Sequence, residues 1–324
     1  ADFRDPKIIK RDNEYILLVA SRTIDYVGQI LIYSSLDGLN FDYKNRIVLQ
    51  RFYGDIVECP DLFHIDNKDI LVFSTQKAIL SSEVQNSFSV FAFIGEFDLK
   101  QYQFIKEYEQ VLDYGFDFYA PQIAFDGQNH VLIAWMNSWE RSMPTHLLNH
   151  GWAGSMTLPR VLKLSDSKIV QSFPTSLLSN EKRVMNEASL SLISKQELDL
   201  VVSTTYLVEF EVKLKDTDVI TLKVLNDKKH YLNIELNGIT KVCSVNRENA
   251  YHMIHTRLAE DNIMRKMSLS SSIKCSILVD KSSVELLING KSMTNLFYSN
   301  DKSNLLTIDS KENIALINFR LFNY

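Results

Sequence analysis

The sequence predicts an all-β chain in two parts, with β-propeller blades over residues 1–172 and a linker followed by a β-sandwich over residues 173–324. Three observations predict this class. Short apolar runs alternate with polar residues, turn-forming pairs return about every ten residues, and a motif of a charged residue and a proline recurs at intervals of 53 and 59 residues. Helical periodicity is hard to find in the first part.

The first strands are expected where apolar runs are rich in β-branched and aromatic residues, at 15–20, 29–33 and 70–74. Turn-forming pairs separate such runs at Asp12-Asn13, Asp37-Gly38, Asp66-Asn67 and Asp126-Gly127. Because these pairs favour tight turns, the runs are expected to form antiparallel hairpins.

The recurring motif contains Asp5-Pro6, then Glu58 before Pro60, then residues 117–122. Each copy leads into an apolar strand, and a repeat of about 40 to 60 residues with four strands is typical of a propeller blade. The polar ends of such strands converge on the central axis. The first part holds three blades and a fraction, fewer than the four to eight of a typical propeller, so we expect further blade material before Ala1.

The change of domain is expected at Pro174 and the polar run 178–181. A short helix or an irregular linker is expected at the beginning of residues 181–200. Alternation then returns at 206–214, 275–280, 283–290 and 314–319. Several alternating strands with little helix predict a β-sandwich, and residues 246–266 show no legible pattern.

The composition excludes several classes of function. The formal net charge is -5 and no Lys/Arg block stands out, so nucleic acid and anionic membrane surfaces are not expected partners. No apolar run approaches the length of a membrane span. The three cysteines have no CxxC spacing and the histidines match no ligand motif, so neither a metal nor a cofactor is expected.

The start of the chain is expected to be the middle of a folded unit. It begins Ala1-Asp2-Phe3 with no initiator Met and no signal peptide. The few, unpatterned cysteines favour a reducing, cytoplasmic compartment. Because the N-terminus is expected to be missing, the absence of a signal peptide is uninformative.

Glu58 is the first candidate for a functional residue. It lies between Ile56-Val57 and Pro60, where a strand must stop because proline cannot donate to the ladder. Burial beside Leu62 is expected to raise the pKa of this carboxyl toward the range of a proton donor. The alternative is a solvated glutamate before a turn, and Asp5 could likewise stabilise a turn before Pro6.

Six motifs in sequence order resemble glycoside hydrolase family 32, the β-fructofuranosidases, which include invertase, sucrose-6-phosphate hydrolase, levanase and inulinase. They are Phe3-Arg4-Asp5-Pro6, Glu58-Cys59-Pro60-Asp61, and residues 117–122, 135–139, 152–160 and 279–289. The resemblance implies a five-bladed β-propeller followed by a β-sandwich. It implies that Asp5 stabilises the transition state and that Glu58 is the general acid/base. The family's nucleophile, an Asp in a Trp-Met-Asn-Asp-Pro-Asn-Gly type motif, has no counterpart here, so we expect an N-terminally truncated chain that is inactive alone.

The resemblance also implies residues that bind the sugar. These are expected to be Arg4, Asp117, Tyr119, Gln122, Trp135 and Trp152. For the two tryptophans a buried packing role is an equal alternative, and Asp117 could instead order a turn. Cys59 is expected to be a packing residue beside the acid rather than a nucleophile.

The implied activity is retaining hydrolysis of the β-fructofuranosyl linkage of sucrose or sucrose 6-phosphate, a small sugar substrate, without metal or cofactor. Three alternatives remain: a fructosyltransferase, a fructan hydrolase such as a levanase or inulinase, and a catalytically inactive fructoside-binding module. A propeller family acting on arabinosides or xylosides fits less well, because the Glu-Cys motif belongs with fructosides. The oligomeric state is open, and an exposed propeller edge could pair with a second copy.

Overall fold

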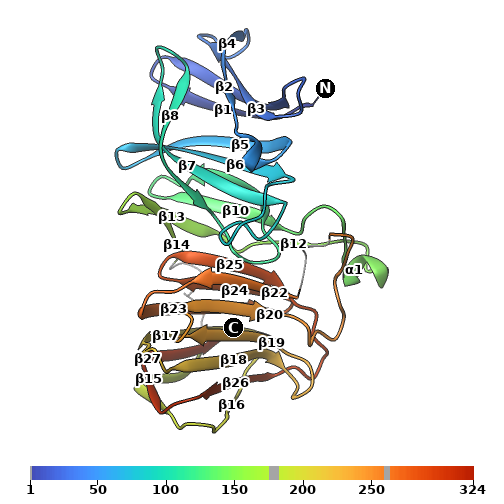
Figure 1. Cartoon of the computed structure of the whole chain (residues 1–324), viewed down its shortest axis with the longest axis vertical. Coiled ribbons are helices and arrows are strands. Elements are labelled where there is room, and N and C mark those ends of the chain that lie inside the picture. Colours follow the sequence, from blue (N-terminus) through green and yellow to red (C-terminus); the bar gives the residue numbers. More distant parts are fainter. Residues whose placement is uncertain (1, 175–181, 259–262) are drawn as a thin grey trace. The chain divides into compact units, whose positions relative to one another are not determined.

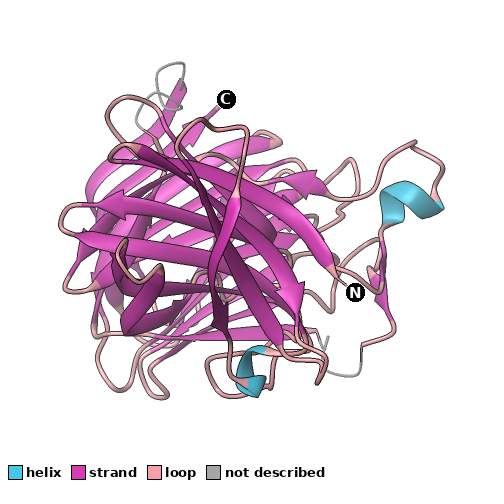
Figure 2. Cartoon of the chain, turned by 90° about the horizontal axis from the view of Figure 1, so that it is seen from above, coloured by secondary structure: helices cyan, strands magenta, loops and turns pink. Residues whose placement is uncertain are grey.

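A computed structural model describes residues 2–174, 182–258 and 263–324, and almost all regular structure within them is β-strand (Figures 1 and 2). The helices in this part of the chain are one turn of 3-10 helix, η1 (Arg51–Tyr53), and the short α1 (Pro144–Leu147). The predicted all-β class is therefore confirmed. No helix in the described ranges has the length and apolar character of a membrane span.

Residue contacts divide the chain into two units. Unit 1 comprises Ala1–Asp113, Phe118–Ser138 and Leu158–Ser172, and unit 2 comprises Tyr114–Asp117, Trp139–Thr157 and Phe173–Tyr324. The sequence analysis assigned residues 114–117 and 139–157 to the first domain. In the structure these two segments pack with the second unit, which a boundary drawn from local patterns does not anticipate.

Unit 1 contains three antiparallel sheets that have the up-and-down order of propeller blades. The first is β1 (Phe3–Arg11), β2 (Glu14–Arg22), β3 (Gly28–Ser35) and β4 (Asp42–Val48). The second is β5 (Ile56–Ile65), β6 (Lys68–Gln76), β7 (Ser89–Asp98) and β8 (Gln103–Val111). In the third, β10 (His130–Met136) pairs with β9 (Tyr119–Phe125) and β13 (Arg160–Ser165), and β13 pairs with β14 (Lys168–Ser172).

The first strand of each blade carries the same local irregularity. Asp5, Cys59 and Ala120 have φ angles of 53°, 49° and 49°, and each precedes a proline. The strand register shifts at all three places. Proline cannot donate to the ladder, so a bulge replaces regular pairing there. The predicted repeat is confirmed, although its third copy is centred on Tyr119-Ala120-Pro121 and not on Asp117.

Unit 2 is a β-sandwich of two six-stranded sheets. The first sheet, in spatial order, is β15 (Lys182–Leu192), β27 (Ile314–Asn323), β17 (Thr205–Lys213), β23 (Ser272–Asp280), β24 (Ser283–Ile288) and β25 (Lys291–Leu296). The second is β16 (Leu198–Val201), β26 (Leu305–Ser310), β18 (Val219–Asn226), β19 (Leu232–Asn237), β20 (Val242–Asn246) and β22 (Met264–Ser268). Inward-facing residues of both sheets form one apolar core, which includes Cys243 and Cys275.

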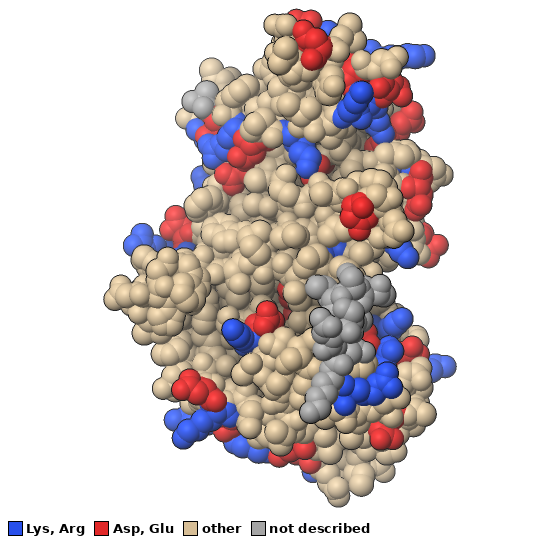
Figure 3. Space-filling model, turned by 180° about the vertical axis from the view of Figure 1, so that it is seen from behind, with Lys and Arg blue, Asp and Glu red and all other residues tan. Residues whose placement is uncertain are grey.

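The remaining short strands of unit 2 are β11 (Arg141–Ser142), which pairs with β21 (His255–Thr256), and β12 (Ser155–Met156). The helix or irregular linker expected at 181–200 is wrong, because residues 182–192 form β15 along the edge of β27. The polar run 178–181, expected to mark the change of domain, lies outside the described residues. On the face shown in Figure 3, acidic and basic side chains are interspersed.

Candidate active site

Equivalent positions of the three blades meet around Glu58. The residues just before the three bulge positions are Arg4, Glu58 and Tyr119. Glu58 Oε1 accepts a hydrogen bond from Arg4 Nη1 at 3.0 Å, and Glu58 Oε2 accepts one from the Tyr119 hydroxyl at 2.6 Å. Glu58 is only 5% exposed. The carboxylate predicted from the sequence is therefore buried and held from both neighbouring blades.

Gln76 is a further partner of Glu58 that the sequence analysis missed. It ends β6, the strand paired with β5, and its Nε2 donates to Glu58 Oε2 at 2.9 Å. Ile56 lies opposite Gln76 in the register of the two strands. Only the hairpin pairing of residues 56–65 with 68–76 could have indicated this contact from the sequence, because it brings Gln76 at the end of β6 beside the start of β5.

Asp5 lies next to Glu58 through the backbone of the following residue. The Cys59 N–H donates to Asp5 Oδ2 at 3.0 Å, and the Cys59 Sγ is 3.7 Å from the same oxygen. Asp5 and Cys59 both have left-handed backbone conformations, which are uncommon outside glycine and concentrate at functional sites. Two carboxylates predicted from different motifs are thus brought together at the starts of neighbouring strands.

Arg4 is a cation that lies among the carboxylates of this site. Its guanidinium also donates to Asp2, and Asp2 in turn pairs with Arg22. Burial acts to lower the pKa of Arg4, but the carboxylates of Asp2, Glu58 and Asp5 outweigh it and the pKa is raised. Arg4 therefore stays a cation beside Glu58.

Tyr119 and Cys59 are both held in their protonated forms. Burial, followed by the charge of Glu58, raises the pKa of Tyr119 well above its usual value, and this side chain is 1% exposed. Burial, followed by the charges of Asp5 and Glu58, raises the pKa of the Cys59 thiol to about 12. A thiol that stays protonated is a poor nucleophile, which agrees with the packing role expected for Cys59.

Gln122 and Trp135 lie in the third blade. Gln122 is exposed on β9, two residues after the bulge, and Trp135 is half-buried on β10 opposite Tyr119. The half-burial of Trp135 leaves part of its ring accessible. Their roles in binding sugar stay predictions.

Asp117 and Trp152 belong to unit 2. Asp117 is fully buried, and its carboxylate accepts hydrogen bonds from Arg141 Nη1 at 2.8 Å, Arg247 Nη1 at 3.1 Å and the Leu296 N–H at 2.7 Å. These contacts favour an ordering role for Asp117 over sugar binding. Trp152 is 57% exposed, so the packing alternative in which it is buried does not hold.

Replacing Asp117 by Asn is expected to lower the free energy of unfolding of unit 2 by about 3–5 kcal/mol, because it removes the anion from buried arginines. Arg141 and Arg247 have side-chain exposures of 1% and 6% beside Asp117. Denaturant unfolding of both variants would measure the loss. Asp216→Asn is the control, since Asp216 is 84% exposed and lies 3.8 Å from Lys241. Equal small losses in the two variants would contradict the anchoring role.

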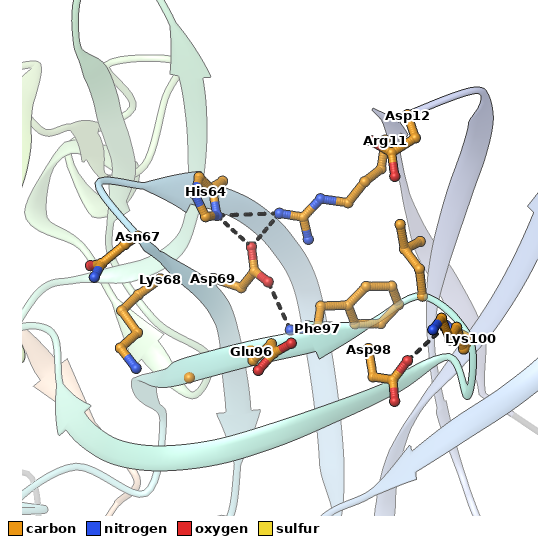
Figure 4. Close-up of a pocket in the computed structure, with 12 residues that line it drawn as sticks. Arg11, Asp12, His64, Asn67, Lys68, Asp69, Glu96, Phe97, Asp98 and Lys100 are labelled. Carbon is orange, nitrogen blue, oxygen red and sulfur yellow. Dashed lines mark hydrogen bonds and ion pairs between the residues drawn. The ribbon is translucent and has the colours of Figure 1, made fainter.

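A separate polar pocket of about 590 Å³ lies at the far ends of β1 and β5 (Figure 4). Arg11, His64 and Asp69 line it, and none of the residues around Glu58 does. In the described ranges, no group of three or more His, Cys, Asp and Glu side chains is arranged to hold a metal ion.

Comparison with known proteins gives two matches that together span almost the whole chain. The model described as "Glycosyl hydrolases family 32 N-terminal domain" matches residues 1–173, and "Glycosyl hydrolases family 32 C terminal" matches residues 175–321. Sucrose-6-phosphate hydrolase of Vibrio alginolyticus is 29% identical over 323 residues, covering 97% of this chain and 63% of the relative. Sucrose-6-phosphate hydrolase of Zymomonas mobilis is 35% identical over 190 residues, covering 53% of this chain and 35% of the relative. The chain therefore spans less than two thirds of the length of these relatives.

Solved structures share the fold. Sucrose-6-phosphate hydrolase from Lactobacillus gasseri superposes with a TM-score of 0.84 at 22% identity, covering 99% of this chain and 66% of that one. A mutant of the Bombyx mori GH32 β-fructofuranosidase BmSUC1 in complex with sucrose superposes with a TM-score of 0.81 at 24% identity, covering 100% of this chain and 66% of that one. The predicted combination of propeller blades and β-sandwich is thereby confirmed.

Proposed function

Because the chain belongs to glycoside hydrolase family 32, we propose that the whole protein is a retaining β-fructofuranosidase that cleaves sucrose or sucrose 6-phosphate. The observation that carries the proposal is the convergence of three blades on Glu58. Arg4 and Tyr119 donate to its two oxygens, and the next peptide N–H binds Asp5. Retaining glycoside hydrolysis requires one carboxylic acid that donates a proton and one carboxylate that acts as nucleophile, and the buried Glu58 fits the first of these roles.

Glu58 has the role of general acid and then general base. In the first step its proton passes to the glycosidic oxygen as the bond from that oxygen to the fructosyl carbon breaks, and a nucleophilic carboxylate forms a fructosyl-enzyme bond. In the second step Glu58 removes a proton from the water that displaces that carboxylate. The nucleophile belongs to a motif that the 324 residues do not contain.

The donors around Glu58 hold both of its carboxylate oxygens. Arg4, Gln76 and Tyr119 donate hydrogen bonds to the carboxylate oxygens. The same contacts fix the side-chain rotamer, so the proton is delivered from one position.

Asp5 has the role of stabilising positive charge on the fructosyl ring. The transition state resembles an oxocarbenium ion, and a fixed carboxylate gains attraction as that charge develops. The Cys59 N–H donates a hydrogen bond to Asp5 Oδ2 at 3.0 Å. This bond holds the carboxylate in place, and because its donor is uncharged it leaves the negative charge of Asp5 intact.

Sucrose 6-phosphate is the substrate we favour within this class. Several relatives bear the name sucrose-6-phosphate hydrolase, including those of V. alginolyticus, Z. mobilis and Staphylococcus xylosus. A sugar phosphate is retained inside a cell, and the three cysteines are free, so we propose a cytoplasmic location.

Assays of the whole protein and of the 324-residue chain on sucrose and sucrose 6-phosphate would test the proposal. The whole protein is expected to release fructose, with a higher kcat/KM on sucrose 6-phosphate, and the 324-residue chain is expected to release none. Transfer of fructose to sugar instead of water at high sucrose would assign a fructosyltransferase. Rapid turnover by the 324-residue chain would contradict the role assigned to an external nucleophile.

A further inference from the structure

Lys7, Asp61 and Gln122 form a second set of equivalent positions, each two residues after a bulge position. They lie on β1, β5 and β9, one from each blade. Lys7 Nζ donates to Asp61 Oδ2 at 2.8 Å and lies 3.5 Å from Gln122 Oε1. The blade repeat therefore brings together two layers of side chains: Arg4, Glu58 and Tyr119 first, and this layer next.

We propose that Lys7 and Asp61 are positioning residues, whose ion pair holds β1, β5 and β9 at the spacing that lets Arg4 and Tyr119 meet Glu58. The kinetic part of this inference rests on the proposed function. Neither side chain is assigned a contact with substrate.

One oxygen of Asp61 joins all three first strands. Asp61 Oδ2 accepts from Lys7 Nζ on β1 and from the Ile123 N–H on β9, at 2.8 and 2.9 Å. Lys7 Nζ also donates to the Ile123 carbonyl at 3.1 Å. Because β5 itself carries Asp61, loss of this one carboxylate would separate three strands at a single point.

The burial of Asp61 makes this link sensitive to substitution. Asp61 is 1% exposed, and burial raises its pKa while Lys7 acts to lower it. Removing one partner of a buried ion pair leaves an uncompensated charge. Asp61 lies three residues after Glu58, and Lys7 lies three residues after Arg4, with the bulge between them. A displacement of the backbone at Lys7 or Asp61 would therefore also displace Arg4 or Glu58.

Arg11 and Asp69 provide a matched comparison at the other end of β1. Their ion pair also connects the first and second blades, and Figure 4 shows Arg11 reaching Asp69 beside His64. Asp69 is 5% exposed and accepts a hydrogen bond from the Phe97 N–H at 2.7 Å. This pair involves the same two sheets and similar burial, but it lies at the opposite end of β1 from Arg4.

The experiment compares Lys7→Met, Lys7→Arg and Arg11→Met in the whole protein. Lys7→Met is expected to lower kcat by about 10- to 100-fold with a smaller change in KM, because small displacements of catalytic groups cost this much. Lys7→Arg keeps the cation and is expected to recover most of kcat. Arg11→Met is expected to lower Tm but leave kcat per folded molecule unchanged. Equal effects of Lys7→Met and Arg11→Met on kcat would overturn the inference.

Two further measurements keep the inference testable if Lys7→Met folds poorly or if the whole protein shows no activity. Lys7→Gln and Asp61→Asn retain polar side chains and are expected to lower kcat in the same direction if Lys7→Met does not fold. A crystal structure of a folded Lys7 variant is expected to show the Arg4 and Tyr119 contacts of Glu58 displaced by about 1 Å. Unchanged contacts would overturn the positioning role, whereas failure of the unaltered whole protein to cleave either sugar would overturn the proposed function alone.

Discussion

Replacing Glu58 by Gln in the whole protein is expected to lower kcat on sucrose by about 10²- to 10⁴-fold, the range of positioned general acid–base groups. Gln matches the shape of Glu but has no proton to deliver at neutral pH. Arg4 can still donate to the amide oxygen, since its Nη1 lies 3.0 Å from Glu58 Oε1. The new amide NH2 takes the place of Oε2, so Gln76 must turn its own amide oxygen toward it and the Tyr119 hydroxyl must accept instead of donate. An unchanged Tm in Glu58→Gln would show that the loss reports the missing proton transfer and not a disrupted site.

The choice of substrate separates acid catalysis from binding. β-Fructofuranosyl fluoride has a leaving group that needs no protonation, so formation of the fructosyl-enzyme from it is expected to be much less impaired in Glu58→Gln than formation from sucrose. Single-turnover kinetics on both substrates would measure that step. Glu96→Gln is the matched control, because Glu96 is an exposed glutamate on β7 of the same blade. A loss below about tenfold on sucrose would contradict the assignment of Glu58 as the acid.

Much of unit 1 could be predicted because its pattern is local. Alternation and turn-forming pairs specify hairpins, and a proline marks where each first strand is interrupted. Asp5-Pro6 and Cys59-Pro60 each carry this signal. Arg4 and Glu58 could be expected near one axis because both lie in copies of the recurring motif, whereas their hydrogen bond is a finding of the structure.

The environment of Asp117 depended on contacts that local patterns do not contain. Its carboxylate binds Arg247 and the Leu296 N–H, which are 130 and 179 residues away in sequence. Gln76 was missed for a related reason: a glutamine at the end of a strand is ordinary, and only the pairing of β5 with β6 brings it to Glu58. The helix or linker expected at 181–200 was wrong because β15 acquires its strand structure from pairing with β27 near the end of the chain.

Replacing Asp5 by Asn is expected to lower kcat by about 10²- to 10³-fold, as for loss of one preorganised electrostatic group. Asp5 has a φ of 53°, and Asn tolerates this left-handed conformation as well as Asp does. The amide oxygen can still accept the Cys59 N–H, which lies 3.0 Å from Asp5 Oδ2. The backbone and this hydrogen bond are therefore preserved, and the principal change is loss of the negative charge that we propose stabilises the fructosyl ring.

Asp12→Asn supplies the matched control for Asp5→Asn. Asp12 follows the same strand β1, has a φ of 50° and is exposed, so it shares the backbone conformation but lies away from Glu58. Steady-state kinetics on sucrose, with thermal unfolding of both variants, would measure the two effects separately. We expect unchanged kcat in Asp12→Asn and similar Tm values in both variants. If Asp5→Asn kept more than about a tenth of the original kcat, stabilisation of the transition state by this carboxylate would be refuted.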